Sequence, residues 1–376
     1  MRRFLNISLA LMAAGGSVAS YSQTASKPQA FALSGEFAGT HDPSIGVDRG
    51  VYYVFATGAV RPDHGEGPPP APPTGDKPDK PVRPASANWP QFPIRCSTDL
   101  HTWKRCGAVF PAVPEWIQQM SPQTAELWAP DISYFDGLYH LYYAFSVFGK
   151  NTSGIALATN LTLDPASPNY KWIDHGLVLR SFATDDFNAI DPNLVLDARG
   201  QAWLSFGSFW TGIKIRKLDR GTGMLSKTDT GLYALAARSD GPLTQPRDPN
   251  LPPDAEAIEA PFIVHHDGFY YLFVSWDLCC RGVKSTYHTM VGRSASVTGP
   301  YVGRDGKPMS QGGGSPLLSA NRIWLGPGGE SLLHLPAEDL IVFHAYSAVD
   351  GHPALHISTI DWKNGWPEAA LEGDGR

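Results

Sequence analysis

Short stretches of alternating apolar and polar residues recur along the chain, and glycine or proline residues separate them. Alternation with a period of two is the pattern of a β-strand with one buried face, and convincing amphipathic helices are missing. Four strands of this kind are rich in aromatic and β-branched residues, and they span 50–55, 137–143, 200–206 and 268–274. The pattern therefore predicts an all-β chain.

Each of these strands follows an acidic residue that lies beside a proline or, for Glu259, one residue away from it. The acidic residues are Asp42, Asp131, Asp191 and Glu259, and a weaker fifth copy spans 326–330. The copies recur every 60–68 residues once a proline-rich segment is set aside, and each holds about four strands. Five such repeats predict a five-bladed β-propeller, in which the first strands of all blades meet at one axis. A pair of β-sandwiches or a β-helix is the alternative.

The chain divides into three parts by composition. Residues 1–20 begin with a basic pair, continue with a short apolar run and end in small residues, which is typical of a secretory signal peptide. A buried N-terminal helix is the alternative. Residues 21–37 read as a polar tail and 38–376 as a single propeller domain, with 61–87 as a proline-rich surface insertion. We therefore expect a secreted or periplasmic protein.

Composition narrows the range of partners. The chain has 376 residues, of which 42% are hydrophobic, so it can bury a large core. Its net charge is −6 and it has no basic block, which argues against nucleic acid as a partner. The apolar run near the N-terminus is too short to span a membrane. We expect a monomer with no nucleic-acid or membrane partner, whose 11 tryptophans and 14 tyrosines can fill a core or stack on sugar rings.

The four cysteines fall into two pairs along the chain. Cys96 and Cys106 flank a hairpin-like stretch, so they can face each other, and export makes a disulfide possible. Cys279 and Cys280 are adjacent, and they can be free thiols, a vicinal bridge or partners of the first pair. Neither pair has the spacing of a zinc site, so a structural role is favoured over a catalytic one.

Convergent carboxylates in an aromatic cleft suit the cleavage of a glycosidic bond. One carboxyl group must give a proton to the leaving oxygen, and another must activate water or attack the sugar. Different surroundings separate the pKa values of such groups. Glu259 is the one glutamate among the first four repeat starts, so we interpret it as a longer side chain that reaches further into the cleft. The alternative is that Asp42 and Asp191 only build turns before their prolines; Asp131 differs because it follows its proline.

Together, these motifs resemble glycoside hydrolase family 43, and within it the arabinanases. The resemblance covers 38–366 and is carried by 41–44, 127–131, 188–193 and 259–262, with 146–153, 206–210 and 275–282 as motifs typical of arabinanases. It implies a five-bladed propeller that hydrolyses α-1,5-linked L-arabinan with inversion. It also implies that Asp42 is the general base, Glu259 the general acid, and Asp191 the residue that raises the pKa of Glu259 and orients it. Inversion predicts that the carboxyl groups of Asp42 and Glu259 lie about 6.5–9.5 Å apart.

The same resemblance predicts which residues line the sugar subsites. Core packing is the alternative for the aromatic ones, and Trp203, which lies inside a strand, is predicted to be core. The predicted lining residues are Trp128, Phe148, Gly154, Asn188, Ala189, Ile190, Ser208, Phe209 and Trp210.

His344 lies in the strand that begins the last repeat. A lone strand histidine is usually a core residue, but the resemblance implies that it lies on the axis beside a hydrated metal ion, which we expect to be calcium. One protein ligand suits an ion that keeps its waters better than a closed zinc site. The resemblance predicts asparagine or histidine after the Gly-Pro-Gly of this repeat, whereas this chain has Glu330 there. The Glu330 side chain can reach the axis or the rim.

The mode of attack is the finest distinction that the sequence addresses. We expect endo action, which needs a cleft that is open at both ends, whereas an insertion 61–87 that crosses one end would favour exo action. An exo-arabinanase, an α-L-arabinofuranosidase or a β-xylosidase of the same family is the nearer alternative. A sugar-binding propeller without catalysis is the remoter one.

Overall fold

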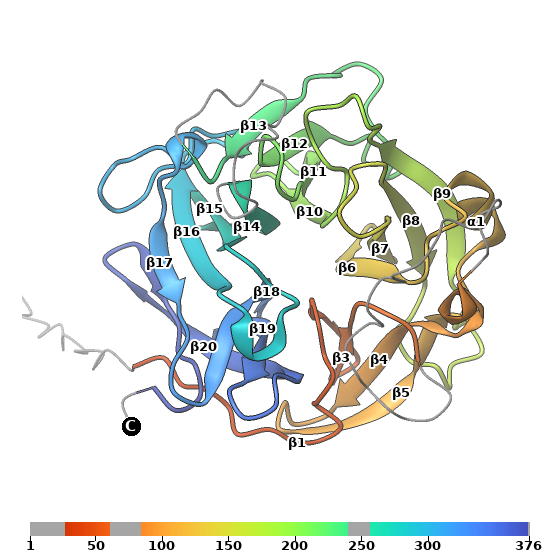
Figure 1. Ribbon diagram of the computed structural model, residues 1–376, viewed down its shortest axis with the longest axis horizontal. Helices are drawn as coiled ribbons and strands as arrows, with labels where there is room; N and C mark the ends of the chain where they lie inside the picture. Colours follow the sequence, from red (N-terminus) through yellow and green to blue (C-terminus); the bar gives the residue numbers. More distant parts are fainter. Residues whose placement is uncertain (1–26, 61–83, 240–255, 375–376) are drawn as a thin grey trace, which may run out of the picture.

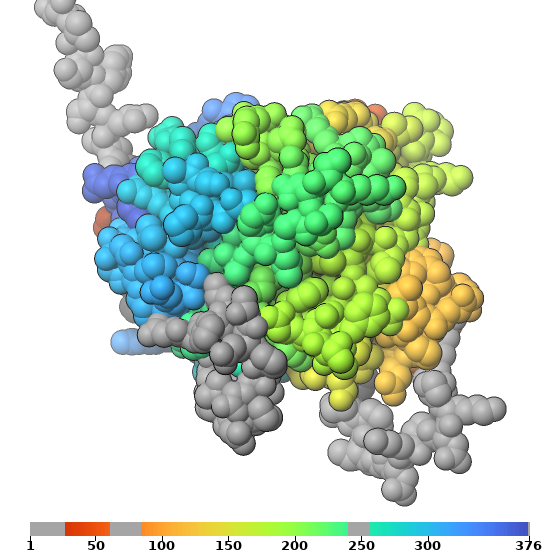
Figure 2. All heavy atoms as spheres, turned by 90° about the horizontal axis from the view of Figure 1, so that it is seen from above, coloured from red at the N-terminus to blue at the C-terminus, as the bar shows by residue number. Residues whose placement is uncertain are grey.

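The computed structural model describes residues 27–60, 84–239 and 256–374, and it contains five β-sheets around a central axis (Figure 1). Each sheet is an antiparallel meander in which strands that follow one another in sequence also pair, apart from one short added strand at an outer edge. Seen from above, the third blade, in green, lies between the second and the fourth (Figure 2). The prediction of an all-β, five-bladed propeller is confirmed.

Four strands make up each blade, from the axis outwards. The first blade contains β2 (Ser44–Asp48), β3 (Val51–Phe55), β4 (Gln91–Ser97) and β5 (Thr102–Phe110); the second, β6 (Leu127–Phe135), β7 (Leu138–Phe145), β8 (Gly154–Asn160) and β9 (Ile173–Arg180); the third, β10 (Asn193–Leu196), β11 (Ala202–Phe206), β12 (Ile213–Lys217) and β13 (Tyr233–Ala236); the fourth, β14 (Ile258–His266), β15 (Phe269–Trp276), β16 (His288–Ser294) and β17 (Ser315–Leu318); the fifth, β18 (Trp324–His334), β19 (Asp339–Ser347), β20 (Pro353–Lys363) and β21 (Trp366–Glu368).

The helices within the described ranges are short and lie between strands. They are η1 (Ala85–Asn88), α1 (Glu115–Met120), η3 (Gly282–Lys284) and η4 (Met309–Gln311). Among the described residues, no helix has the length and the apolar character needed to cross a membrane.

Neighbouring blades are held together by the apolar faces of their sheets. Phe55 of β3 and Leu141 of β7 share one buried cluster between the first two blades. Ile45 of β2 packs with Val342 of β19, which closes the ring between the first blade and the last. Each such side chain, when fully buried, contributes roughly 1.5–3 kcal/mol of hydrophobic free energy. The rigid ring fixes where the inner strands begin.

The N-terminal segment also joins the first and last blades. β1 (Ser34–Gly35) pairs in parallel with β5, while Ala30 and Ala38 form isolated bridges to β20 of the last blade. Buried Arg95 donates hydrogen bonds to the carbonyl oxygens of Glu36 and Ala38. The described part of the expected polar tail, 27–37, is thus packed against two blades.

Two expected segments fall mainly outside the described residues. The signal peptide, 1–20, lies there entirely, and so do residues 61–83 of the proline-rich insertion 61–87. The end of that insertion is described and belongs to η1, where Ala87 is fully buried.

The backbone at the start of each inner strand corrects the alignment of the repeats. A residue with positive φ precedes the proline in all five blades: Asp42 at 45°, Ala129 at 45°, Asp191 at 54°, Ala260 at 52° and Gly326 at 58°. Such angles are uncommon for residues other than glycine, so they mark one equivalent position. Glu259 lies one residue before it. Our interpretation of Glu259 as a longer version of the Asp42 and Asp191 position is therefore wrong by one residue.

The position after each proline links one blade to the next. The Ser44 hydroxyl accepts the Ile132 amide at 2.9 Å, and the Asp131 carboxylate accepts the Leu194 amide at 2.8 Å. Asn193 accepts a corresponding amide of the fourth blade at 2.9 Å. Burial raises the pKa of Asp131 to about 6. Asp131 thus joins the second blade to the third, which accounts for its place after the proline.

Candidate active site

A cavity lies near the start of the inner strands, on the axis of the ring of blades that Figure 1 shows. Its volume is about 40 Å³, and it is lined by residues of all five blades, including Asp42, Asp191 and Glu330. Most of the lining residues come from the proline turns described above. Residues distant in sequence meet in one place because each is the corresponding turn of a different blade.

Asp42 is held in its ionised form by the groups around it. The Thr57 hydroxyl donates to Oδ2 at 2.6 Å, and Nδ1 of His41 lies 2.9 Å from the same oxygen. Burial alone would raise the pKa of Asp42, but His41, His344 and Thr57 together hold it well below its usual range. An ionised carboxylate on the axis is the form that a general base requires.

The pKa of Glu259 is shifted in the opposite direction, above its ordinary value. Burial raises its pKa and the negative charge of Asp42 adds to that rise, although two hydrogen bonds oppose it. Those bonds are donated by the Ser208 hydroxyl to Oε2 and by the Tyr287 hydroxyl to Oε1, both at 2.7 Å. The carboxyl group therefore keeps a proton to higher pH than an exposed glutamate, as a general acid must.

Asp191 is coupled to Glu259. Its pKa is raised well above the ordinary value, first by burial and then by the charges of Glu259 and Asp42. Its Oδ2 accepts the backbone amide of Ala260 at 3.1 Å, so it also fixes the peptide that follows Glu259. The negative charge of Glu259 thus disfavours the ionised form of Asp191.

The predicted lining residues do not all share one environment. Asn188, Ala189 and Ile190 are buried directly before Asp191, and Ser208 is buried and bonded to Glu259.

The aromatic predictions differ more in exposure. Phe209 and Trp210 are half-buried and both have positive φ, at 56° and 48°, while Trp128 is half-buried beside Ala129. Phe148 is 76% exposed in the loop after β7. Trp203 is confirmed as a core residue, in a cluster between the third and fourth blades.

Gly154 has a packing requirement of its own. A Cβ atom at this position would overlap the ring of Phe145 in the neighbouring strand. The glycine therefore lets β8 lie close to β7.

Two partners of the acids and one partner of His41 were missed in the sequence. Thr57, the partner of Asp42, follows β3, and Tyr287, the partner of Glu259, precedes β16. Tyr346 lies on β19 with its hydroxyl 2.7 Å from Nε2 of His41. Thr57 and Tyr287 stand in connections whose lengths differ between blades, so no repeated spacing points to them. His41 adjoins Asp42 in its motif, which was a usable signal.

His344 and Glu330 each present a buried polar atom to the axis region. The His344 ring is fully buried; its Nδ1 accepts the Asp42 amide at 3.2 Å, and its Nε2 has no hydrogen-bond partner among the described residues. Burial holds the pKa of His344 well below its usual value, so the ring is neutral.

Glu330 is the second such group. It accepts the Ser275 hydroxyl at Oε2 at 3.0 Å, while its Oε1 also lacks a partner within the described ranges. Burial raises the pKa of Glu330 to about 7. A buried carboxyl group with free lone pairs, on the same axis as a neutral imidazole, fits a small cation that retains some water.

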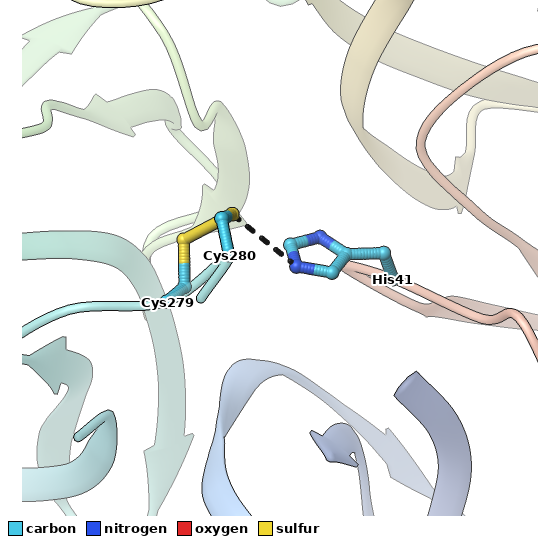
Figure 3. A group of neighbouring side chains, drawn as sticks. All are labelled: His41, Cys279 and Cys280. Carbon is cyan, nitrogen blue, oxygen red and sulfur yellow. Dashed lines mark hydrogen bonds between the residues drawn. A yellow bond between two sulfur atoms is a disulfide. The ribbon is translucent and has the colours of Figure 1, made fainter. Parts of the chain in front are cut away.

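The structure resolves the cysteine alternatives. Cys96 is bonded to Cys106, and the adjacent Cys279 and Cys280 form a vicinal disulfide (Figure 3). Cys280 is exposed, and its Sγ lies 3.6 Å from Nε2 of His41.

Comparison with known families agrees with this arrangement. The profile of glycosyl hydrolases family 43 matches residues 38–367, nearly the whole propeller. The chain belongs to this family. The resemblance inferred from the sequence motifs is confirmed, and with it the assignment of the chain as a glycoside hydrolase.

Relatives of this family 43 chain include enzymes of both modes of attack. The extracellular exo-α-(1→5)-L-arabinofuranosidase ArbA of Cellvibrio japonicus is 43% identical over 288 residues, which is 74% of this chain and 80% of the relative. The extracellular endo-α-(1→5)-L-arabinanase 1 of Bacillus subtilis is 42% identical over 273 residues, 72% of this chain and 77% of the relative. The structure of Cellvibrio cellulosa α-L-arabinanase complexed with arabinohexaose has a TM-score of 0.74 at 37% identity and covers 89% of this chain and 96% of that one.

Proposed function

We propose that this family 43 glycoside hydrolase cleaves α-1,5-L-arabinofuranosidic linkages in arabinan, by endo attack and with inversion of configuration. The observation that carries the proposal is the opposite shift of the pKa values of two half-buried carboxyl groups in one site. The pKa of Asp42 is held low while that of Glu259 is raised, first by burial. The arabinanase names of relatives at 42–43% identity support the substrate.

Each carboxyl group has a distinct part in the proposed reaction. Asp42, as the ionised base, takes a proton from the attacking water, and Glu259, as the acid, gives its proton to the leaving glycosidic oxygen. Inversion requires space for that water between the base and the sugar. Asp191 keeps the proton of the pair available through its charge coupling with Glu259, and orients Glu259 through the amide of Ala260.

The endo assignment is tested by the products formed at early times. Debranched arabinan gives a ladder of mixed oligomers under endo attack, whereas a single short product from the first minutes indicates the exo-arabinanase or arabinofuranosidase alternative. A β-xylosidase would release xylose from xylo-oligosaccharides instead. Inversion is tested in the same samples by proton NMR, because the β-anomer of the new reducing end must appear first.

Catalysis itself is tested against the sugar-binding alternative. Glu259→Ala removes the proposed acid and should abolish hydrolysis while arabinan binding persists. Unchanged hydrolysis would remove Glu259 from the acid role. Unchanged binding by an inactive wild-type protein would instead favour a propeller that only binds sugar.

We also propose export and an axial cation. The names of both relatives given above describe extracellular proteins, which supports the secretory interpretation of residues 1–20. His344, with Glu330 nearby on the axis, would hold a hydrated divalent cation, with calcium as the candidate. When bound, such an ion would supply positive charge that stabilises the ionised acids. The test is to remove metal from the protein with a chelator and then titrate calcium into it in a calorimeter, which measures binding without reference to activity.

A further inference from the structure

The vicinal disulfide lies beside the catalytic base rather than in the core. Cys279 and Cys280 stand in the connection between β15 and η3, and Figure 3 shows their bond directed towards the ring of His41. The exposed Sγ of Cys280 is 3.6 Å from Nε2 of that ring. A covalent bond that is placed here can affect the surroundings of Asp42.

A continuous chain of hydrogen bonds connects this disulfide turn to the base. The backbone amide of Cys280 donates to the Tyr346 oxygen at 2.9 Å, and the Tyr346 hydroxyl lies 2.7 Å from Nε2 of His41. Nδ1 of His41 lies 2.9 Å from Oδ2 of Asp42. Nδ1–H of His41 donates to Asp42 in either protonation state of the ring. Nε2 accepts from Tyr346 when the ring is neutral and donates to the Tyr346 oxygen when the ring is protonated, so the contacts exist in both states. We call Cys280, Tyr346, His41 and Asp42 the positioning chain.

The disulfide determines where the first amide of the positioning chain points. Cys280 has a φ of 65°, which is unfavourable for a residue other than glycine. A bond between adjacent cysteines closes a small ring around the peptide that joins them, and so holds this backbone conformation. The turn is also pressed against the hairpin at Gly351, where a Cβ would meet the backbone of Gly282 at 2.8 Å. The Cys280 amide is therefore fixed towards Tyr346, which is almost fully buried.

We propose that Tyr346 and His41 are positioning residues that hold the carboxylate of Asp42 towards its water, and that the closed Cys279–Cys280 disulfide keeps Tyr346 in place. The inference rests on the proposed function, because it takes Asp42 as the general base. Opening the disulfide frees the turn and loosens the positioning chain. Since the loss concerns the step in which water is activated, kcat falls while KM changes little.

A phosphine reductant opens the disulfide in a balanced step. The sulfur–sulfur bond breaks, phosphorus gives two electrons, and water supplies the oxygen of the phosphine oxide and the two protons of the thiols. Alkylation followed by mass spectrometry establishes that Cys279 and Cys280 have become free. Cys96→Ser/Cys106→Ser is the matched control, because it lacks the other disulfide and retains the vicinal one.

The experiment measures kcat and KM on debranched arabinan with and without the phosphine TCEP. Tyr346→Phe should lower kcat about tenfold, the effect of one lost hydrogen bond, with KM within about twofold. TCEP should lower kcat in the wild type and in Cys96→Ser/Cys106→Ser, and should have no further effect in Tyr346→Phe or in Cys279→Ala/Cys280→Ala. His41→Asn, which keeps a donor near Asp42, should retain more of kcat than His41→Ala.

Several results would overturn the inference. TCEP could lower kcat equally in the wild type and in Tyr346→Phe. Cys279→Ala/Cys280→Ala could have the kcat of the wild type. Tyr346→Phe could change KM and leave kcat unchanged. Asp42→Ala separates this failure from that of the proposed function. If Asp42→Ala is inactive while Tyr346→Phe is as active as the wild type, only the positioning chain is refuted; if Asp42→Ala stays active, the base assignment fails first.

Discussion

Replacing Tyr287 by phenylalanine should move the alkaline limb of the pH–rate profile to higher pH. The Tyr287 hydroxyl donates to Oε1 of Glu259 at 2.7 Å and stabilises the ionised form, so it lowers a pKa that burial raises. Its removal therefore raises that pKa further. The general acid must be protonated, and activity is lost as the pH rises through its pKa. A higher pKa thus extends activity towards alkaline pH.

The size of this shift follows from the contact. A hydrogen bond to a charged group contributes roughly 1.5–3 kcal/mol, and one pKa unit corresponds to about 1.4 kcal/mol. Tyr287 is 2% exposed, so solvent weakens the contact little. The remaining hydrogen bond from Ser208 and the coupling to Asp191 make the shift of the pKa smaller than the loss of one bond alone would give. We expect a shift of about one pH unit, which describes the coupled pair rather than Glu259 alone.

The assay is kcat/KM against pH on a soluble arabino-oligosaccharide, because this ratio reports the free enzyme. Ser208→Ala should move the limb in the same direction, since Ser208 donates to the other oxygen of Glu259. Tyr301→Phe is the matched control, because its buried hydroxyl donates to the carbonyl of Val297 within the same blade. An alkaline limb that stays in place or moves to lower pH in Tyr287→Phe would refute the reasoning.

Three further changes test other parts of the site. Asp191→Asn should lower kcat more than it raises KM in steady-state kinetics, because it removes the carboxyl group whose ionisation is coupled to that of Glu259. An effect on KM alone would contradict this. Asp131→Ala should destabilise the fold by about 1–3 kcal/mol in urea unfolding, since it leaves the buried amide of Leu194 without its acceptor, and an unchanged midpoint would contradict the inter-blade role. EDTA should lower the melting temperature of the wild type and calcium should restore it, whereas His344→Ala should respond to neither; equal responses of the two proteins would place any ion elsewhere.

The sequence predicted the architecture because the architecture repeats. Strands such as β7 and β15 carry the same alternation of aromatic and β-branched residues after the same proline turns, so their number and order could be counted. The pairing of β1 with β5 and the isolated bridges of Ala30 and Ala38 to β20 could not be predicted, because strands of one or two residues carry no periodic signal. Their pairing depends on the edge that the finished ring offers to Ser34 and Gly35.

The acidic residues of the site were predictable because their motifs also carry the expected chemistry. The alignment of the repeats was not, because it depends on backbone conformation. The sequence aligns Glu259 with Asp191, whereas the positive φ angles align Ala260 with Asp191. The donors that set the state of the acids, Thr57 and Tyr287, come from connections between strands. Their contribution depends on donor–acceptor distances, 2.6 Å for Thr57 and 2.7 Å for Tyr287, which no sequence pattern encodes.

The central claim is that Glu259 protonates the leaving oxygen while Asp42 activates water, and leaving-group dependence tests it most directly. The measurement is kcat/KM of Glu259→Ala on debranched arabinan and on the 4-nitrophenyl glycoside of α-1,5-arabinotriose, whose leaving group needs no proton. The account predicts a loss of about a thousandfold or more on arabinan, at the upper part of the range for acid catalysis, and a far smaller loss on the nitrophenyl substrate. Equal losses on the two substrates would contradict it.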